Sequence, residues 1–137
     1  MISVGKKLVS EFYSSDFFNK VQQSEKYLHP EMELFWNAKT GYSHMSREDI
    51  SKATAEAAKS FETVRCDITH LLEEGNNVTI RFTFYVTTIE NPTEEMPIAH
   101  FVAIWKIKDG LMYKGYQMSL PAEESPEAMI SYKGINL

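Results

Sequence analysis

The segment FVAIWKIKDGL, residues 101–111, is the strongest indication of the fold in this sequence. It begins as a strand with apolar side chains on both faces, which is typical of a strand in the middle of a sheet. Lys108-Asp109-Gly110 then predicts a tight turn, because Asp-Gly favours the backbone angles of a hairpin loop. We therefore expect residues 111–120 to return beside residues 98–108 as the last strand.

Two further strands are predicted before this hairpin. Apolar and polar side chains alternate along residues 62–72 and again along residues 78–87, which is the period of a strand with one buried face. Glu74-Gly75-Asn76-Asn77 between them predicts a hairpin turn. Residues 91–95 connect the second strand to the central one. The four strands together predict an antiparallel meander.

The N-terminal 28 residues have a helical pattern. Val4, Leu8 and Phe12 recur every four residues, which indicates one apolar helix face. Ser14-Ser15-Asp16 bends or ends this helix, and a second short helix is expected after it. His29-Pro30 ends the second helix, because the residue before a proline avoids helical backbone angles.

A strand and a third helix are predicted next. Residues 31–36 are rich in large side chains and indicate a short strand, and residues 37–42 indicate a turn or loop. Ser46, with Asp49 three residues later, forms a capping box for a helix that extends to about Ser60. The predicted fold class is α+β, with three N-terminal helices packed on a strongly curved, mainly antiparallel sheet.

This arrangement predicts a cone with an internal pocket. Three helices do not cover a long curved sheet completely, and the uncovered concave face is the usual place for a small molecule. We expect residues 1–120 to form this single domain. Residues 121–137, which contain two prolines and several acidic residues, are expected to form a C-terminal tail.

Composition and charge exclude several functions. The 137 residues, 43% hydrophobic and 24% charged, suit one globular domain. A formal net charge of −5 without a basic run disfavours nucleic acid and anionic membranes, and no apolar run of about 18 residues predicts a membrane span. Cys66 is the single cysteine and the four histidines are scattered, so we expect no metal, no cofactor and a reduced, cytoplasmic location.

Several phrases resemble the nuclear-transport-factor-2-like superfamily. They are YLHPEM at residues 27–32, SREDI at residues 46–50 and the FVAIWKIKDGL stretch at residues 101–111. Their order covers residues 3–120 and is most similar to the SnoaL-like polyketide-cyclase and isomerase-type branch. The resemblance implies an α+β cone. In this superfamily that fold serves isomerases, dehydratases, cyclases and non-catalytic binding domains alike, so the site must be argued from its residues.

Tyr13 and Asn37 form the first candidate pair. In ketosteroid isomerases a tyrosine of the first helix donates to an enolate oxygen, and an aspartate after the first strand moves the proton. Tyr13 and Asn37 stand at a very similar separation, so the resemblance implies that Tyr13 is an oxyanion donor. Asn37 departs from the pattern because a carboxamide is no base near neutral pH, although it can hold a carbonyl or a water. A core position for Tyr13 and a turn position for Asn37 remain the alternatives.

His100 is the candidate acid or base. A neutral imidazole facing the cavity would serve either role near neutral pH. The resemblance aligns Ala103 with an acidic oxyanion donor, and His100 has the opposite strand parity from Ala103. His100 therefore points inward only if a bulge intervenes, and its alternative place is the outer face, at a subunit contact.

The remaining candidates line the expected pocket. Gln117 lies on the last strand, where a buried amide suits a polar ligand group. Large apolar side chains would form the walls, although each of them alone also suits an ordinary core. These side chains are Trp36, Phe82, Phe84, Trp105 and Met118.

Three functions stay open at this point. The favoured one is a small-molecule-binding domain with an apolar, aromatic-lined pocket and no established chemistry. The second is an isomerase, cyclase or dehydratase that acts by proton transfer on a carbonyl-bearing apolar substrate, and the third is a protein-interaction module. Arg81, Thr83 and Tyr85 form a mixed face on one strand. Together with the superfamily's usual pairing through the convex sheet, this face implies a homodimer.

Overall fold

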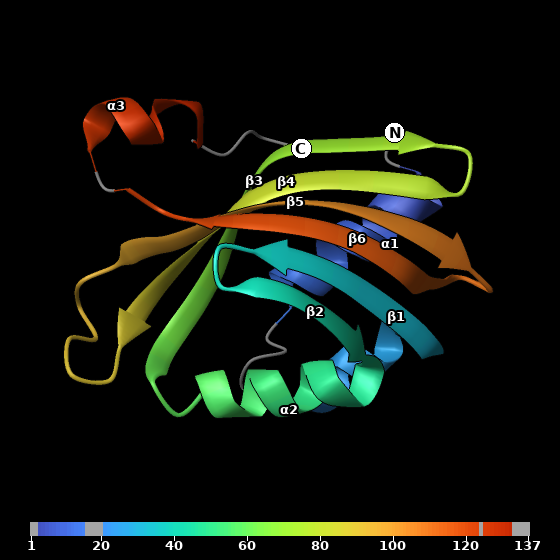
Figure 1. The fold of residues 1–137 in the computed structure, drawn as a ribbon, viewed down its shortest axis with the longest axis horizontal. Helices are drawn as coiled ribbons and strands as arrows, with labels where there is room; N and C mark the ends of the chain where they lie inside the picture. Colours follow the sequence, from blue (N-terminus) through green and yellow to red (C-terminus); the bar gives the residue numbers. More distant parts are fainter. Residues whose placement is uncertain (1–2, 16–20, 124, 133–137) are drawn as a thin grey trace.

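The computed structural model describes residues 3–15, 21–123 and 125–132 (Figure 1). Most of the helical residues lie in the first half of the chain, and the strands form one continuous sheet. The elements in chain order are α1 (Val4–Ser14), the 3₁₀ helix η1 (Val21–Lys26), β1 (Leu28–Ala38), β2 (Gly41–Ser46), α2 (Arg47–Ala57), β3 (Phe61–Glu74), β4 (Asn77–Thr88), β5 (Met96–Lys108), β6 (Leu111–Pro121), α3 (Pro126–Met129) and the 3₁₀ helix η2 (Ile130–Tyr132).

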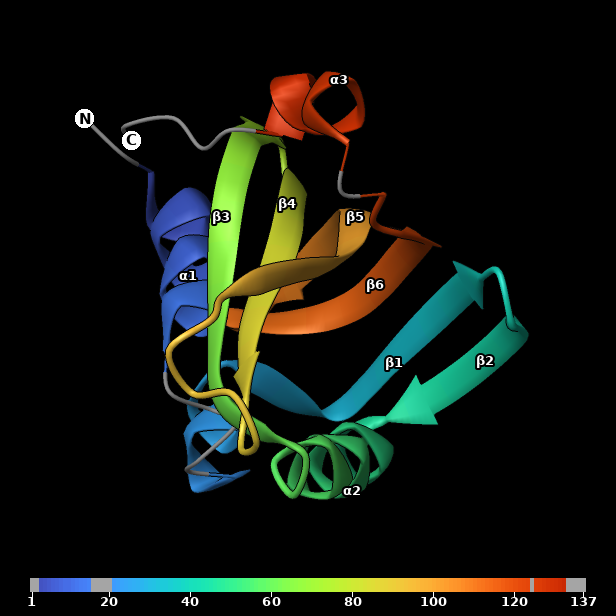
Figure 2. The same cartoon turned by 90° about the vertical axis from the view of Figure 1, so that its left-hand side faces the viewer.

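The sheet is mixed, with six strands in the order β2-β1-β6-β5-β4-β3. Among the described residues, the β1–β6 pair is parallel and the other four strand pairs are antiparallel. Figure 2 shows the sheet curving into an open trough, with α1 along β3 and α2 beside the β1–β2 hairpin. The α+β class, the curved sheet and the predicted meander from β3 to β6 are confirmed.

The prediction of three N-terminal helices is wrong. One α-helix, α1, lies at the N-terminus, α2 lies in the middle of the chain, and the third, α3, lies near its C-terminus. The expected second helix is the six-residue 3₁₀ helix η1. Strand β1 begins sooner than expected, at Leu28, and includes Pro30. The β1–β6 register shifts between Leu28 and Glu33, and such an irregular stretch accommodates a residue without a backbone N–H.

Strand β2 lies partly where the sequence predicted a turn or loop. Gly41 has a φ of 127°, which a residue with a side chain rarely adopts, and it reverses the chain directly after β1. None of the β2 side chains is buried. The strand therefore lacks the alternating apolar pattern that revealed the others.

The C-terminal segment packs on the outer, convex face of the sheet. Arg81 of β4 donates to the carbonyl oxygen of Ser131 at 2.9 Å, and its guanidinium lies 4.2 Å from the ring centroid of Tyr132. The Tyr132 ring also stacks on His100 of β5, with ring centroids 3.4 Å apart. This segment thus covers part of the face that was expected to meet a second subunit. Within the described residues, no helix has the length and apolar character that a membrane crossing requires.

Candidate functional site

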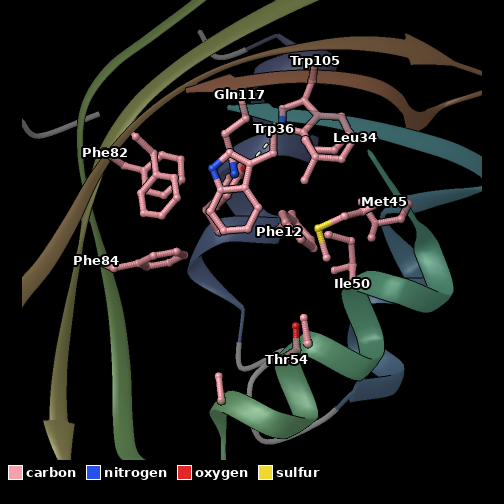
Figure 3. Close-up of a pocket in the computed structure, with 15 residues that line it drawn as sticks. Phe12, Leu34, Trp36, Met45, Ile50, Thr54, Phe82, Phe84, Trp105 and Gln117 are labelled. Carbon is pink, nitrogen blue, oxygen red and sulfur yellow. Dashed lines mark hydrogen bonds between the residues drawn. The ribbon is translucent and has the colours of Figure 1, made fainter. Parts of the chain in front are cut away.

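An apolar cavity of about 210 Å³, here called the inner cavity, lies between the concave face of the sheet and α2 (Figure 3). The sheet and α1 supply its deep wall, and α2 supplies the opposite wall. The lining residues are Phe12, Tyr13, Leu28, Leu34, Trp36, Met45, Ile50, Ala53, Thr54, Ala57, Phe82, Phe84, Phe101, Trp105 and Gln117.

Aromatic rings from three strands form most of the deep wall. Phe82 and Phe84 both point inward because they are two residues apart on β4. Phe82 stacks on Phe101 of β5, with ring centroids 4.9 Å apart and planes 7° apart. Trp36 of β1 completes this wall, and its indole nitrogen donates to the Ser119 hydroxyl at 2.8 Å. The rings are thereby held in place around the empty space.

Tyr13 is the one titratable group among the described residues that line the inner cavity. Its hydroxyl oxygen accepts a hydrogen bond from the indole nitrogen of Trp105 at 2.9 Å. Burial raises the pKa of Tyr13 far above its ordinary value, and the bond from Trp105 only partly opposes this shift. The phenol is therefore neutral at physiological pH. Since its oxygen already accepts from Trp105, its own hydrogen remains available as a donor.

The position of Trp105 depends on a glycine of the neighbouring strand. Gly115 on β6 lies directly opposite Trp105 on β5. A Cβ atom at Gly115 would lie 2.7 Å from the indole ring, which is closer than side-chain contacts allow. The absence of that atom lets the indole lie against β6 with its nitrogen at Tyr13.

Gln117 presents its amide to the inner cavity. The residue is 8% exposed and stands beside Trp36 in the parallel β1–β6 pair. Within the described part of the chain, its side chain has no hydrogen-bond partner, and its polar atoms remain accessible from the cavity. An amide that can both donate and accept is thus free to meet a polar ligand group.

Asn37 and His100 lie away from the inner cavity. Asn37 follows the inward-facing Trp36 on β1, so it occupies the other face of the sheet, and it is exposed. His100 precedes the inward-facing Phe101 and also occupies the outer face. The β4–β5 register shifts only beyond Phe84, so no bulge turns His100 inward. Met118, the other expected wall residue, is 69% exposed on the outer face.

The surroundings of His100 are those of a structural residue. Its Nδ1 lies 2.7 Å from the Thr83 hydroxyl, and its ring stacks on Tyr132. Burial lowers the pKa of His100, and the charge of Arg81 lowers it further. The imidazole is therefore neutral near physiological pH, and it sits on the opposite side of the sheet from Tyr13.

The α2 wall was not foreseen as part of the site. Ile50, Ala53 and Ala57 recur at helical spacing and form one apolar stripe of α2, which lines the inner cavity. Thr54 lies beside that stripe and lines the cavity too. The small size of three of these four residues was the available signal, because small side chains on a helix facing a sheet leave space between them.

Other reactive groups are scarce. Among the described residues, no cluster of three or more His, Cys, Asp or Glu side chains could hold a metal ion. Burial raises the pKa of the Cys66 thiol well above its ordinary value, so the thiol stays protonated and weakly nucleophilic.

A curved sheet that encloses an apolar cavity with α-helical cover defines the class of small-molecule-pocket domains with the nuclear-transport-factor-2-like fold. The family model of the SnoaL-like domain matches residues 16–114. The chain therefore belongs to the SnoaL-like domain family.

Solved structures share this fold at low sequence identity. IdmH from Streptomyces antibioticus, a suggested polyketide cyclase, is 13% identical with a TM-score of 0.66, and the match covers 84% of this chain and 91% of IdmH. AclR from Streptomyces galilaeus, a suggested hydroxylase, is 18% identical with a TM-score of 0.67, and the match covers 84% of this chain and 77% of AclR. A suggested polyketide cyclase from Acidithiobacillus ferrooxidans is 13% identical with a TM-score of 0.66, and the match covers 87% of this chain and 89% of the cyclase. No curated protein matched the sequence.

Proposed function

We propose that this domain binds an uncharged, flat and largely apolar small molecule in the inner cavity. The observation that carries the proposal is that none of the described lining side chains has a formal charge. Burying an unpaired ion in such a place is strongly unfavourable, so a charged ligand is disfavoured. The aromatic walls favour a ligand whose faces can lie against rings.

The polar groups of the deep wall give the ligand an orientation. Tyr13 donates from its hydroxyl, and Gln117 offers both a donor and an acceptor. Trp36, Phe82 and Phe84 provide apolar contact. A ligand carbonyl directed toward Tyr13 and Gln117 satisfies groups that otherwise face an apolar space.

A binding titration tests this proposal. We expect 1-tetralone, an uncharged bicyclic ketone, to quench the fluorescence of Trp36 and Trp105 saturably, and 1-naphthoate, a bicyclic anion, to bind far more weakly. Phe84→Asp places a carboxylate in the cavity wall and should abolish 1-tetralone binding. Thr79→Asp, a substitution outside the lining, is the matched control. Equal binding of the ketone and the anion, or quenching that Phe84→Asp leaves unchanged, contradicts the proposal.

A catalytic alternative is favoured by the geometry of Tyr13. A neutral phenol whose oxygen already accepts from Trp105 is a suitable donor to an enolate oxygen. An isomerase, cyclase or dehydratase acting on a carbonyl-bearing substrate would use Tyr13 in that role. None of the described lining residues is a candidate base, so proton removal would fall to the substrate or to water.

Exchange of the α-protons of 1-tetralone in D₂O, followed by NMR, separates binding from catalysis. If the domain is catalytic, the wild-type protein accelerates the exchange and Tyr13→Phe loses the acceleration. If Tyr13→Phe exchanges as fast as wild type, the oxyanion role is excluded, while 1-tetralone binding still supports the binding domain.

We further propose that the domain forms a homodimer through the outer face of the sheet. Five exposed apolar residues lie side by side on β5 and β6, where Val102 pairs with Met118 and Ile104 pairs with Tyr116. An exposed patch of this kind is typical of an interface. The outer stripe, as it is called below, consists of Val102, Ile104, Tyr116, Met118 and Leu120.

The proposed dimer contact on β5 and β6 lies beside the face of Arg81, Thr83 and Tyr85 on β4, which the sequence had suggested as the interface. Arg81 and Thr83 are engaged by the chain's own Ser131 and by His100, whereas the outer stripe is uncovered in the single chain. A partner that is a second copy meets the same apolar stripe across a two-fold axis. The cytoplasmic location expected from the sequence stays a prediction.

A further inference from the structure

Thr54 is a polar residue in an apolar wall, and its side chain has no hydrogen-bond partner among the described residues. It is 8% exposed and is the only buried residue of α2. A threonine hydroxyl inside a helix usually donates to the carbonyl oxygen one turn earlier. Within the described residues the Thr54 hydroxyl has no partner of any kind, and it is accessible from the inner cavity. Valine would fill the same space without a polar group to satisfy.

The surroundings of Thr54 leave room for a ligand against α2. Ala53 and Ala57 flank it with side chains of one carbon each. Figure 3 shows the Thr54 hydroxyl directed into an open space, with Phe84 across it and Gln117 on the deep wall. Two polar side chains, each 8% exposed and without a partner among the described residues, thus face the inner cavity from opposite walls.

We infer that Thr54 and Gln117 form a two-point polar recognition site across the inner cavity. The ligand then has an apolar body with oxygen functions at two opposite edges, one for each residue. This inference rests on the proposed binding function and deepens it, because it makes Thr54 a specificity-determining residue. Buried polar groups are nearly always hydrogen-bonded, so a ligand that satisfies both residues is preferred over one that satisfies one.

The hydroxyl of Thr54 and the amide of Gln117 limit which oxygen groups the ligand can carry at its two edges. A threonine hydroxyl and a glutamine amide each donate and accept, so each end of the ligand can be a carbonyl or a hydroxyl. A carboxylate is disfavoured at either end, because no described lining residue supplies a cation.

Matched bicyclic probes test the inference on the full chain. Tetralin has no oxygen, 1-tetralone has one carbonyl, and the 5-, 6- and 7-hydroxy-1-tetralones add a second oxygen at different places on the far ring. Affinities come from calorimetry or from tryptophan quenching. We expect at least one hydroxytetralone to bind more tightly than 1-tetralone by roughly 2- to 10-fold, the effect of one net hydrogen bond.

Two substitutions show which end of the ligand each residue binds. Thr54→Val should weaken the hydroxytetralone more than 1-tetralone, and so remove the advantage of the second oxygen. Gln117→Leu should reduce the advantage of 1-tetralone over tetralin, with Tyr13 still donating to the carbonyl. Thr79→Val, on the outer face, is the matched control and should change neither ratio.

The probe affinities separate an error in the two-point site from an error in the proposed binding function. If tetralin and all tetralones bind alike, or if Thr54→Val weakens 1-tetralone and the hydroxytetralones equally, the two-point site is wrong and the binding cavity stands. If none of the probes binds, tetralin included, the proposed function is wrong and the inference falls with it.

Discussion

The indole nitrogen of Trp105 and the hydroxyl oxygen of Tyr13 lie 2.9 Å apart, although 92 residues separate them in the sequence. This hydrogen bond joins β5 to α1 inside the core. Both residues are nearly inaccessible to solvent, at 2% and 6% exposure. The bond therefore fixes the one phenol of the inner cavity and connects the first helix to the central strand.

Replacing Trp105 by Phe should destabilise the fold by about 1–3 kcal/mol, because it leaves the Tyr13 hydroxyl without its donor and a gap where the indole lay. Tyr13→Phe should cost less, since only the indole N–H is left unpaired. A double-mutant cycle in urea unfolding measures the coupling, which we expect at about 1 kcal/mol. Strictly additive effects would show that the bond contributes no coupling.

Gly115→Ala should destabilise the fold by about 1–3 kcal/mol, because the new methyl group overlaps the indole of Trp105. It should also shift the tryptophan emission, since the indole must move from Tyr13. Thermal unfolding and fluorescence spectra measure both effects. Lys106→Ala, an exposed change on the adjacent strand, is the control. If Gly115→Ala melts like that control, the close approach is not required.

Stability should depend on pH through His100. Its pKa in the folded state lies below the ordinary value of 6.5, because burial and Arg81 disfavour the charged form. The unfolded chain therefore binds the proton more readily, and the contribution to the free energy of unfolding is lost as pH falls from about 6.5 through the lower folded value.

The comparison with His100→Gln isolates this effect from other titrating groups. Glutamine keeps a polar contact to Thr83 and does not titrate. In urea unfolding between pH 7.5 and 5, the wild type should lose more stability than the variant. Parallel pH curves for the two proteins would mean that His100 does not contribute.

A charge in the outer stripe should prevent dimer formation. Met118 is 69% exposed, so Met118→Asp leaves the single chain's fold intact while placing a carboxylate in the apolar contact. Light scattering after size exclusion should give a dimer for wild type and a monomer for the variant. Ile89→Asp, at an apolar residue 54% exposed just beyond β4, should remain dimeric. A monomeric wild-type protein at high concentration would overturn the proposed dimer.

The sheet was predictable from the sequence wherever one face of a strand is buried. Residues 78–87 alternate cleanly because Val78, Ile80 and Phe82 are all inaccessible inside. Strand β2 was not predictable, since none of its side chains is buried and its sequence therefore shows no alternating apolar pattern. The placement of the helices failed in part because η1 is too short for periodicity to distinguish it from an α-helix.

The residues of the candidate site were predictable where alternation along a strand alone decides which face of the sheet a side chain occupies. Phe82, Phe84, Trp105 and Gln117 all lie on the face that parity gives them, and that face lines the inner cavity. Separation along the sequence was a poorer guide. Asn37 matches a family position in spacing, yet its neighbour Trp36 holds the inward place. The recognition role of Thr54 could not be inferred from its small size, because only the structure shows that its hydroxyl lacks a partner among the described residues.

The parallel pairing of β1 with β6 also determines the order in which the molecule can form. The hydrogen bond from Trp36 to Ser119 spans 83 residues, and strands β3, β4 and β5 lie between its two ends in the sequence. On the ribosome, β1 must wait unpaired on that edge until nearly the whole chain has been synthesised. The hollow that would receive a ligand is therefore completed last, when β1 and its partner β6 finally pair.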